Sequence, residues 1–155
     1  MSPAQFTPRL QDLLCFSLYA ANNAMNRVYV PLLEPLKLTY AQYVVLVVLW
    51  EADGLPVTQI GEKLGLETNT LTPLLKRMEA AGLLTRRRNP RDERQVIVAL
   101  TPAGKKLEAK AAHIPSCIGE AAEMKLAEMI DLRESLAGLR QSLTKPGKPV
   151  SRKHV

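Results

Sequence analysis

The sequence predicts a mainly α-helical fold that contains one small β-hairpin. Three observations carry the prediction. Residues 57–82 place apolar residues at helical spacing on both sides of a glycine, residues 83–100 read as two strands around an arginine-rich segment, and long helical patterns flank both regions. Together they predict a winged helix-turn-helix with flanking dimerisation helices, in a single domain over residues 1–143.

The first helix is predicted to run from Pro8 to about residue 31. Thr7 suits a helix cap, and proline is favoured at the first helical position because its missing N–H has no partner there. Pro31 and Pro35 are expected to end the helix, since an internal proline removes a backbone hydrogen bond. One apolar face contains Leu10, Leu14, Leu18, Ala21, Met25 and Val28.

The second helix is predicted to begin after Thr39 and to lie at the centre of the core. Thr39 and Gln42 have the spacing of a capping box, in which each side chain bonds the backbone of the other residue. Residues 44–50 are apolar on nearly every side, which is typical of a buried helix. Asp53 and Gly54 are expected to close it.

A helix-turn-helix is predicted in residues 57–82, within a DNA-binding module of about residues 39–100. Gly61 is expected where two helices cross closely, Gly65 where the turn needs a positive φ, and Gly82 where the second helix stops. A plain helical hairpin would show the same pattern, but short polar and cationic side chains suit the DNA major groove. The predicted contacts on the second helix are its cap Thr68, then Asn69, Thr70, Thr72, Lys76 and Arg77.

A wing is predicted directly after this helix. Residues 83–85 and 95–100 read as strands, and residues 86–94 as an arginine-rich loop turned by Asn89 and Pro90.

Arginine suits the narrow and electronegative minor groove of DNA, whereas the alternative is a solvated run of charges. Asp92 lies two residues from Arg94, close enough to orient its guanidinium group. The predicted wing contacts are Arg86, Arg88, Arg91, Asp92 and Arg94.

Two more helices and a tail are predicted after the wing. Thr101 and Pro102 have the pattern of a cap and first residue, and residues 114–116 are expected to interrupt that helix. Residues 144–155 read as a disordered basic tail. The last helix is expected from about Cys117 to Leu143, with Met129, Leu132, Leu136, Leu139 and Leu143 at the spacing of a helix-packing seam.

The flanking helices, about residues 8–31 and 101–143, are predicted to form a homodimer. A two-fold dimer would read both halves of a pseudo-palindromic double-stranded DNA operator. The charge agrees with this partner, because residues 57–100 carry eight cations against five anions within a net charge of +6.

Other function classes find no support in the sequence. No signal peptide and no apolar run of membrane-spanning length stands out, so a cytoplasmic protein without membrane contact is expected. His113 and His154 are far apart, and no glycine-rich phosphate loop or hydrolytic motif occurs, so no metal, cofactor or enzymatic activity is predicted.

Cys15 and Cys117 remain without an assigned role. On spacing alone, a cysteine in an apolar helix reads as a small buried hydrophobe or as a reactive thiol, and both readings stay open. A reactive thiol must be ionised. A helix beginning at Pro8 would place Cys15 about two turns inside the helix, beyond the reach of the helix dipole. Other groups would then have to stabilise the charge of its thiolate.

The chain resembles the MarR family of winged-helix repressors over nearly all of residues 8–143. The resemblance rests on the capped helix at Tyr40, LTPLLKRMEAAGLL (residues 71–84), the Asp92-x-Arg94 wing and VALTPAG (residues 98–104). Residues 13–51 are most similar to the organic hydroperoxide resistance regulators. Asn69 stands where a small residue is common, and the basic tail is additional.

This resemblance implies that Cys15 is the peroxide-reactive cysteine and that Tyr29 and Tyr40 donate hydrogen bonds to its thiolate. Cys117 would then mark the two-cysteine type. The implied mechanism is oxidation of Cys15 by an organic hydroperoxide, followed by a disulfide to Cys117 between subunits that releases DNA. Two alternatives remain: a MarR-type repressor released by a small phenolic or aromatic ligand, and a thiol peroxidase.

Overall fold

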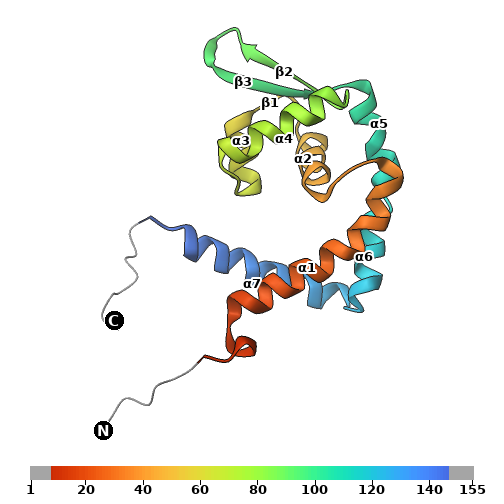
Figure 1. The fold of residues 1–155 in the computed structure, drawn as a ribbon, viewed down its shortest axis with the longest axis vertical. Helices are drawn as coiled ribbons and strands as arrows, with labels where there is room; N and C mark the ends of the chain where they lie inside the picture. Colours follow the sequence, from red (N-terminus) through yellow and green to blue (C-terminus); the bar gives the residue numbers. More distant parts are fainter. Residues whose placement is uncertain (1–7, 147–155) are drawn as a thin grey trace. The chain divides into compact units, whose positions relative to one another are not determined.

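The computed structural model describes residues 8–146, which divide into two compact units (Figure 1). Residues up to Pro115 belong to the first unit, and residues from Ser116 belong to the second. The elements in chain order are η1 (Leu10–Asp12), α1 (Leu14–Leu33), η2 (Glu34–Leu36), α2 (Tyr40–Glu51), β1 (Leu55–Pro56), α3 (Val57–Leu64), α4 (Thr68–Ala80), β2 (Leu84–Asn89), β3 (Asp92–Leu100), α5 (Pro102–Ala111), α6 (Ile114–Ala122) and α7 (Leu126–Thr144).

Helix α2 contributes the centre of the core in the first unit, as predicted. The capping box is present: the Gln42 N–H donates to Thr39 Oγ1 at 3.3 Å, and the Thr39 N–H donates to Gln42 Oε1 at 2.9 Å. Val45, Leu46 and Leu49 are completely buried. The apolar surface that they remove from water is the main source of stability for this helix.

Helix α1 differs from its prediction at both ends. It begins at Leu14, after the short helix η1, whereas the sequence pointed to Pro8. It also continues through Pro31 and ends at Leu33. Leu33 is buried, and its carbonyl accepts the Leu38 N–H at 3.2 Å, so the last turn is fixed by packing despite the internal proline.

The glycines of the helix-turn-helix have their predicted roles. Gly65 has a φ of 66° at the end of α3, and Gly82 has a φ of 74° after α4. A Cβ on Gly61 would lie 2.7 Å from the Leu66 carbonyl oxygen. Real Cβ contacts are longer than this, so α3 can meet the turn at this distance only through glycine.

A three-stranded antiparallel sheet follows the order β1-β3-β2. Strands β2 and β3 form the wing, with Leu84 paired to Leu100 and Arg88 paired to Val96. Strand β1 pairs Leu55 with Val98 and was not predicted, because two residues are too few to show a strand alternation.

The C-terminal helices break at other points than predicted. The Thr101 hydroxyl caps α5 by accepting the Gly104 N–H at 3.1 Å, as expected. Helix α5 ends at Ala111, so residues 114–116 begin α6 instead of interrupting a helix. The prediction of a single last helix was wrong, because α6 and α7 are separated at Glu123, which has a φ of 51°. The predicted tail includes residues 147–155, which lie outside the described residues.

No single helix in residues 8–146 is long and apolar enough to cross a membrane. The segments Leu14–Leu36 and Tyr40–Glu51 reach the required length and composition only when taken together, and they are bent by 72°.

The start of α5 packs directly on the connection between α4 and β2. The Thr101 N–H donates to the Leu83 carbonyl at 3.1 Å, and the Trp50 Nε1–H donates to the Gly104 carbonyl at 3.0 Å, which joins α5 to α2. A Cβ placed on Gly104 would overlap the Leu83 carbonyl oxygen.

Replacing Gly104 with alanine is therefore expected to lower the free energy of unfolding by roughly 3 kcal/mol, because backbone must move to admit the methyl group. Urea denaturation at fixed protein concentration measures this loss. The exposed Ala109→Gly variant on the same helix is the control, with an expected cost of about 1 kcal/mol. A Gly104→Ala loss no larger than the control's would contradict the proposed overlap.

Candidate functional site

Helix α4 buries one face and presents the other. Leu71, Leu75 and Met78 are completely buried, which fixes the rotation of the helix about its axis. The polar face follows from that rotation. Asn69, Thr70, Lys76 and Arg77 are exposed, and Thr72 is half-buried.

The cap of α4 is Glu67, so the prediction that Thr68 caps the helix is wrong. The Glu67 carbonyl accepts the N–H groups of Thr70 and Leu71, both at 3.0 Å, and no side chain bonds the helix start. Thr68 is therefore the first helical residue. Its hydroxyl is free of the capping bond and belongs to the hollow described next.

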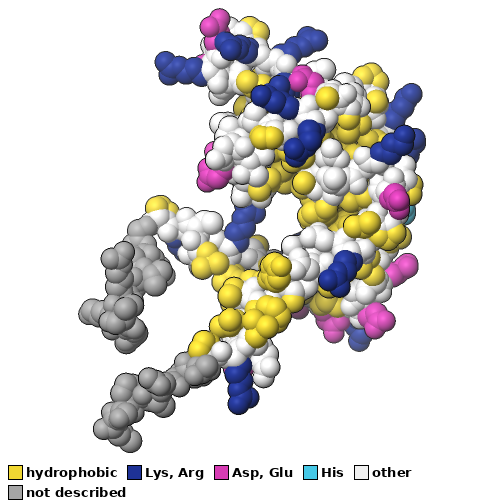
Figure 2. All heavy atoms as spheres, in the orientation of Figure 1, with side chains coloured by type: hydrophobic (Ala, Val, Ile, Leu, Met, Phe, Trp, Pro, Cys, Tyr) yellow, Lys and Arg dark blue, Asp and Glu magenta, His cyan; other side chains and the backbone are white. Residues whose placement is uncertain are grey.

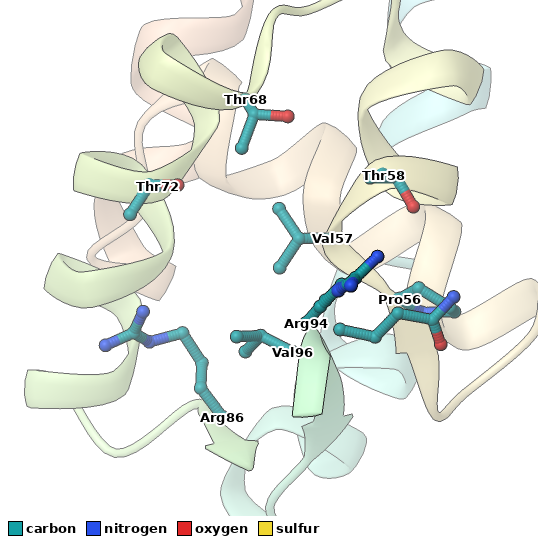
Figure 3. A pocket seen from close by; sticks show the side chains of 9 residues that line it. Pro56, Val57, Thr58, Thr68, Thr72, Arg86, Arg94 and Val96 are labelled. Carbon is teal, nitrogen blue, oxygen red and sulfur yellow. The ribbon is translucent and has the colours of Figure 1, made fainter. Parts of the chain in front are cut away.

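A hollow of about 160 Å³ lies between α3, α4 and the sheet (Figure 3). Four predicted contacts line it: Thr68 and Thr72 from α4, and Arg86 and Arg94 from the wing strands. Hydroxyl and guanidinium donors in one concave surface are suited to phosphate oxygens. The remaining lining residues are Pro56, Val57, Thr58, Gln95 and Val96.

Thr58 was missed by the sequence reasoning. It lies in the first turn of α3, where a hydroxyl side chain is common, so its residue type alone gave no sign of a site. Its place opposite Thr68 in Figure 3 is a tertiary feature.

The wing strands are longer than predicted, so residues 86–94 are not a loop. Strand β2 continues to Asn89 and β3 begins at Asp92, which leaves Pro90 and Arg91 as the turn. The Asn89 Oδ1 accepts the Arg91 N–H at 3.0 Å, in agreement with the predicted role of Asn89. The run of arginines was mistaken for a loop because charge obscured the strand alternation.

The arginines of the wing point to different faces of the hairpin. Arg86 pairs with Val98 and Arg88 with Val96, while Arg87 pairs with Ile97 between them. Because side chains alternate along a strand, Arg87 faces away from Arg86 and Arg88. Figure 2 shows Lys and Arg side chains extending from the wing at the upper end of the first unit.

Asp92 does not act as predicted. Its Oδ1 accepts the backbone N–H of Arg94 at 3.1 Å, and within residues 8–146 the two side chains form no ion pair. The carboxylate therefore stabilises the start of β3, while the guanidinium of Arg94 stays available at the hollow.

Glu79 joins the end of α4 to the base of the wing. Its carboxylate accepts the Arg86 backbone N–H at 3.0 Å and the Arg86 Nε–H at 3.1 Å. The backbone hydrogen bond from Arg86, with the side-chain bond second, holds the pKa of Glu79 below its ordinary value. These two bonds fix the wing relative to α4.

Cys15 is the second residue of α1, and its thiol is free and exposed. The prediction that it lies about two turns inside the helix is wrong, because the helix begins at Leu14. The first helical N–H groups have no partners within the helix and favour an anion beside them.

Tyr29 and Tyr40 are brought together, but Cys15 is not with them. The two ring centroids are 4.8 Å apart, and Tyr43 lies 5.8 Å from Tyr29 and 6.2 Å from Trp50. Cys15 and Tyr29 belong to the same helix, and their separation in sequence corresponds to about 21 Å of helix. One chain alone therefore cannot assemble the predicted thiol site.

A pocket of about 390 Å³ adjoins the tyrosine pair. Val30, Leu33 and Leu38 give it an apolar surface, and the rings of Tyr29 and Tyr40 line it as well. It has the size and character of a site for a small organic molecule.

Tyr29 is expected to keep its proton to unusually high pH. Burial, followed by the neighbouring phenols of Tyr40 and Tyr43, raises the pKa of Tyr29 from 10.0 to about 12. Burial and Tyr40 also raise the pKa of Tyr43. Tyr29 is therefore a hydrogen-bond donor throughout the physiological range.

A tyrosinate absorbance titration should show a step near pH 12 that disappears in Tyr29→Phe. Because the pKa in the folded chain is raised, the contribution of Tyr29 to stability is complete below pH 10.0 and is lost as the pH rises toward 12. The unfolding free energy of the wild type should fall more steeply in this window than that of Tyr29→Phe. Superimposable titration curves would contradict the assignment.

Cys117 lies on α6 in the second unit, where its thiol is free and half-buried. The predicted seam follows on α7. No residue of α7 is buried in the single chain, and Leu132, Leu136 and Leu143 are exposed. An exposed apolar row of this kind is typical of an interaction surface.

No group of three or more histidine, cysteine, aspartate or glutamate side chains could hold a metal ion in the part of the chain that the structure describes.

Comparison with known proteins places these features among transcriptional regulators. The family model of the transcriptional regulator SarA/Rot matches residues 27–111. The organic hydroperoxide resistance transcriptional regulator of Bacillus subtilis (strain 168) is 43% identical over 87% of this chain and 92% of its own length. The HTH-type transcriptional regulator TtmR of Methylorubrum extorquens (strain PA1) is 47% identical over 86% of this chain and 69% of its own length.

Solved structures of AbfR are also similar. Reduced AbfR bound to DNA superposes with a TM-score of 0.75 at 34% identity, covering 87% of this chain and 92% of AbfR. Disulfide-formed AbfR superposes with a TM-score of 0.58 at 37% identity, covering 87% and 90%. These proteins are regulators, which supports the prediction that the chain is not an enzyme and removes the thiol peroxidase alternative.

Proposed function

Because this chain belongs to the MarR family of winged-helix transcriptional regulators, within the organic hydroperoxide resistance group, we propose that it is a redox-sensing DNA-binding repressor. Its reduced homodimer binds a pseudo-palindromic operator, and oxidation of Cys15 by an organic hydroperoxide releases it. The observation that carries the proposal is the position of Cys15, exposed at the start of α1, together with the paired phenols of Tyr29 and Tyr40.

The DNA-reading surface consists of α4 and the wing. Asn69 and Thr70 lie near the N-terminal end of α4, where a recognition helix meets base edges. Lys76 and Arg77 follow as phosphate contacts, while the wing supplies arginine to the minor groove. The DNA-bound structure of reduced AbfR supports this assignment. The wing contacts proposed are Arg86, Arg88, Arg91 and Arg94, with Asp92 supporting Arg94 through its backbone.

The homodimer is formed through α1 and the C-terminal helices. Only Leu33 is buried among the residues of α1, although Leu14, Leu18 and Met25 are apolar and exposed. The leucines of α7 in the second unit are exposed as well. Two-fold pairing would cover these side chains and place two recognition helices on one operator.

The thiol site is shared between the two subunits. If α1 helices cross in antiparallel order, the Cys15 end of one helix comes beside the Tyr29 end of its partner. The separation of about 21 Å within one helix is then bridged by the second copy. Phenol donors and the N-terminus of α1 together stabilise the thiolate.

The reaction begins when the Cys15 thiolate attacks the outer oxygen of the hydroperoxide. A sulfur–oxygen bond forms and the oxygen–oxygen bond breaks, which yields cysteine sulfenic acid and, after proton uptake, an alcohol. The Cys117 thiolate then attacks the sulfenic sulfur. A disulfide forms and the hydroxyl group leaves as water.

Disulfide formation demands Cα atoms within about 7 Å of each other. Closing that distance between Cys15 and Cys117 draws the helices of the dimer into a new arrangement. The two recognition helices change their spacing, so operator affinity falls although no DNA-contacting residue is altered. The existence of a disulfide-formed structure of AbfR supports the disulfide step.

A gel shift with operator DNA tests the proposal. Cumene hydroperoxide should release the wild type, and dithiothreitol should restore binding. A non-reducing gel should show a crosslinked dimer that is absent in Cys117→Ser. Retained operator binding by the wild type after stoichiometric oxidation of Cys15 would reject the mechanism.

A repressor released by a small phenolic or aromatic ligand is the second candidate, favoured by the apolar pocket of about 390 Å³ beside Tyr29. This candidate would be favoured if a variant without cysteine responded to peroxide in the same way as the wild type and was still released by the ligand.

A further inference from the structure

Another pocket in the first unit shares no lining residue with the pocket beside the tyrosines or with the hollow between α3, α4 and the sheet. It has a volume of about 340 Å³ and is formed by η2, the connection from α4 to β2, and one face of α5. Its floor is apolar, with Leu36, Ala81, Leu83, Ala103 and Leu107, and its only charged lining residues are Lys37, Lys106 and Lys110.

Helix α5 supplies both the floor and the charge at regular spacing. Ala103, Lys106, Leu107 and Lys110 recur at three- and four-residue intervals, so they share one helical face. Figure 2 shows Lys and Arg side chains beside apolar ones over α5. This face of α5 is therefore amphipathic, because its cations lie beside its apolar residues.

The three lysines lack carboxylate partners among residues 8–146. The neighbouring Lys105 differs, because its Nζ lies 3.7 Å from Asp53 Oδ2. The three ammonium groups are exposed and surround one apolar pocket, so they give it a positive potential that attracts an anion. The complementary charge is therefore negative.

Lys37 is held in place by an uncommon backbone conformation. Its φ is 55°, in the left-handed region that a non-glycine residue adopts at a cost. The Lys37 N–H donates to the Glu34 carbonyl at 2.9 Å, and the Leu38 N–H donates to the Leu33 carbonyl at 3.2 Å. The turn thus directs Lys37 to the pocket opposite α5.

Operator DNA is not the occupant of this pocket. Ala81 and Leu83 follow the C-terminal end of α4, whereas Thr68 and Asn69 lie at its N-terminal end, about 20 Å away along the helix. The phosphate backbone of DNA binds through its charge and would gain no favourable contact from an apolar floor. The pocket requires a ligand with both an apolar body and a negative head.

We propose that this pocket binds an amphipathic organic anion of the alkyl carboxylate class. The alkyl chain covers Leu36, Leu83 and Leu107, and the carboxylate accepts hydrogen bonds from the ammonium groups of Lys106 and Lys110 on one side and Lys37 on the other. The volume is within the range of small-molecule sites. This site is independent of Cys15 chemistry.

Titration calorimetry with decanoate, kept below its critical micelle concentration, tests the proposal on the full-length protein. One decanoate per chain is expected. The Lys106→Gln/Lys110→Gln double variant should bind at least about tenfold more weakly, a loss of about 1.4 kcal/mol. Lys105→Gln is the matched control, because it removes a charge from the same helix outside the pocket, and its affinity should match the wild type.

Two further ligands test whether the pocket needs both the alkyl chain and the negative charge. Decan-1-ol has the same chain without the charge and should bind at least about tenfold more weakly than decanoate, and inorganic phosphate should not compete at equal concentration. Amide NMR shifts on decanoate binding should include Leu36, Leu83 and Leu107. Unchanged affinity in the double variant, equal affinity for decan-1-ol, effective competition by phosphate, or shifts confined to Tyr29 and Tyr40 would each overturn the assignment.

Discussion

Cys15→Ser is expected to abolish the release of operator DNA by organic hydroperoxide while leaving the affinity of the untreated protein within about twofold of wild type. Serine keeps the size of the side chain but cannot form a sulfenic acid. Because Cys15 is exposed at the first turn of α1 and has no part in the buried core, the fold should tolerate the change. Gel shifts with and without cumene hydroperoxide measure both quantities.

Cys117→Ser is the control for this experiment, since it removes the other thiol. It should form no crosslinked dimer, and it should keep operator affinity when Cys15 becomes sulfenic acid, because the disulfide is what moves the recognition helices. Release of Cys15→Ser by hydroperoxide at the wild-type dose would show that another group is the sensor.

Arg94→Ala is expected to weaken operator binding by roughly tenfold to a hundredfold, because Arg94 lines the hollow that also contains Thr68 and Thr72. The slope of log affinity against log salt should decrease by about one if the guanidinium contacts a phosphate. Fluorescence anisotropy with labelled operator at several salt concentrations measures both effects.

Arg87→Ala provides the matched control. Arg87 carries the same charge on the same hairpin, but its strand position directs it to the opposite face. Its loss should reduce affinity by less than about threefold. Equal losses in the two variants would mean that the wing acts through net charge alone.

Local signals allowed much of the fold to be predicted. The Thr39–Gln42 capping box, the positive φ of Gly65 and the Thr101 cap each depend on a few adjacent residues, so the sequence pattern contains them. The break at Glu123 could not be predicted in this way. Neither glycine nor proline marks it, and its left-handed φ is set by the surrounding structure.

The errors at α1 and the wing have a common physical origin. Pro8 and Pro31 are strong local signals, but helix α1 begins after Pro8 and passes through Pro31 because tertiary packing at Leu33 outweighs one lost hydrogen bond. In the wing, strand pairing outweighs the preference of a charged segment for solvent. Both outcomes depend on partners distant in sequence.

The candidate site was predictable in residue type more than in geometry. The sequence and its resemblance pointed to Cys15, Tyr29 and Tyr40, and their places on one predicted helix already separated Cys15 from Tyr29 by about 21 Å. Only the structure shows that the phenols of Tyr29 and Tyr40 are adjacent. Thr58 lines the hollow between α3, α4 and the sheet, and no sequence signal pointed to it.

Trp50 is an intrinsic fluorophore, and its Nε1–H donates a hydrogen bond to the Gly104 carbonyl. Trp50 is the sole indole in the chain, and its neighbour Tyr43 adjoins the phenol of Tyr29. Its emission wavelength and lifetime therefore report on the junction between α2 and α5 without any label. Rearrangement beside the phenols can be followed in real time by stopped-flow optics during a single exposure to oxidant.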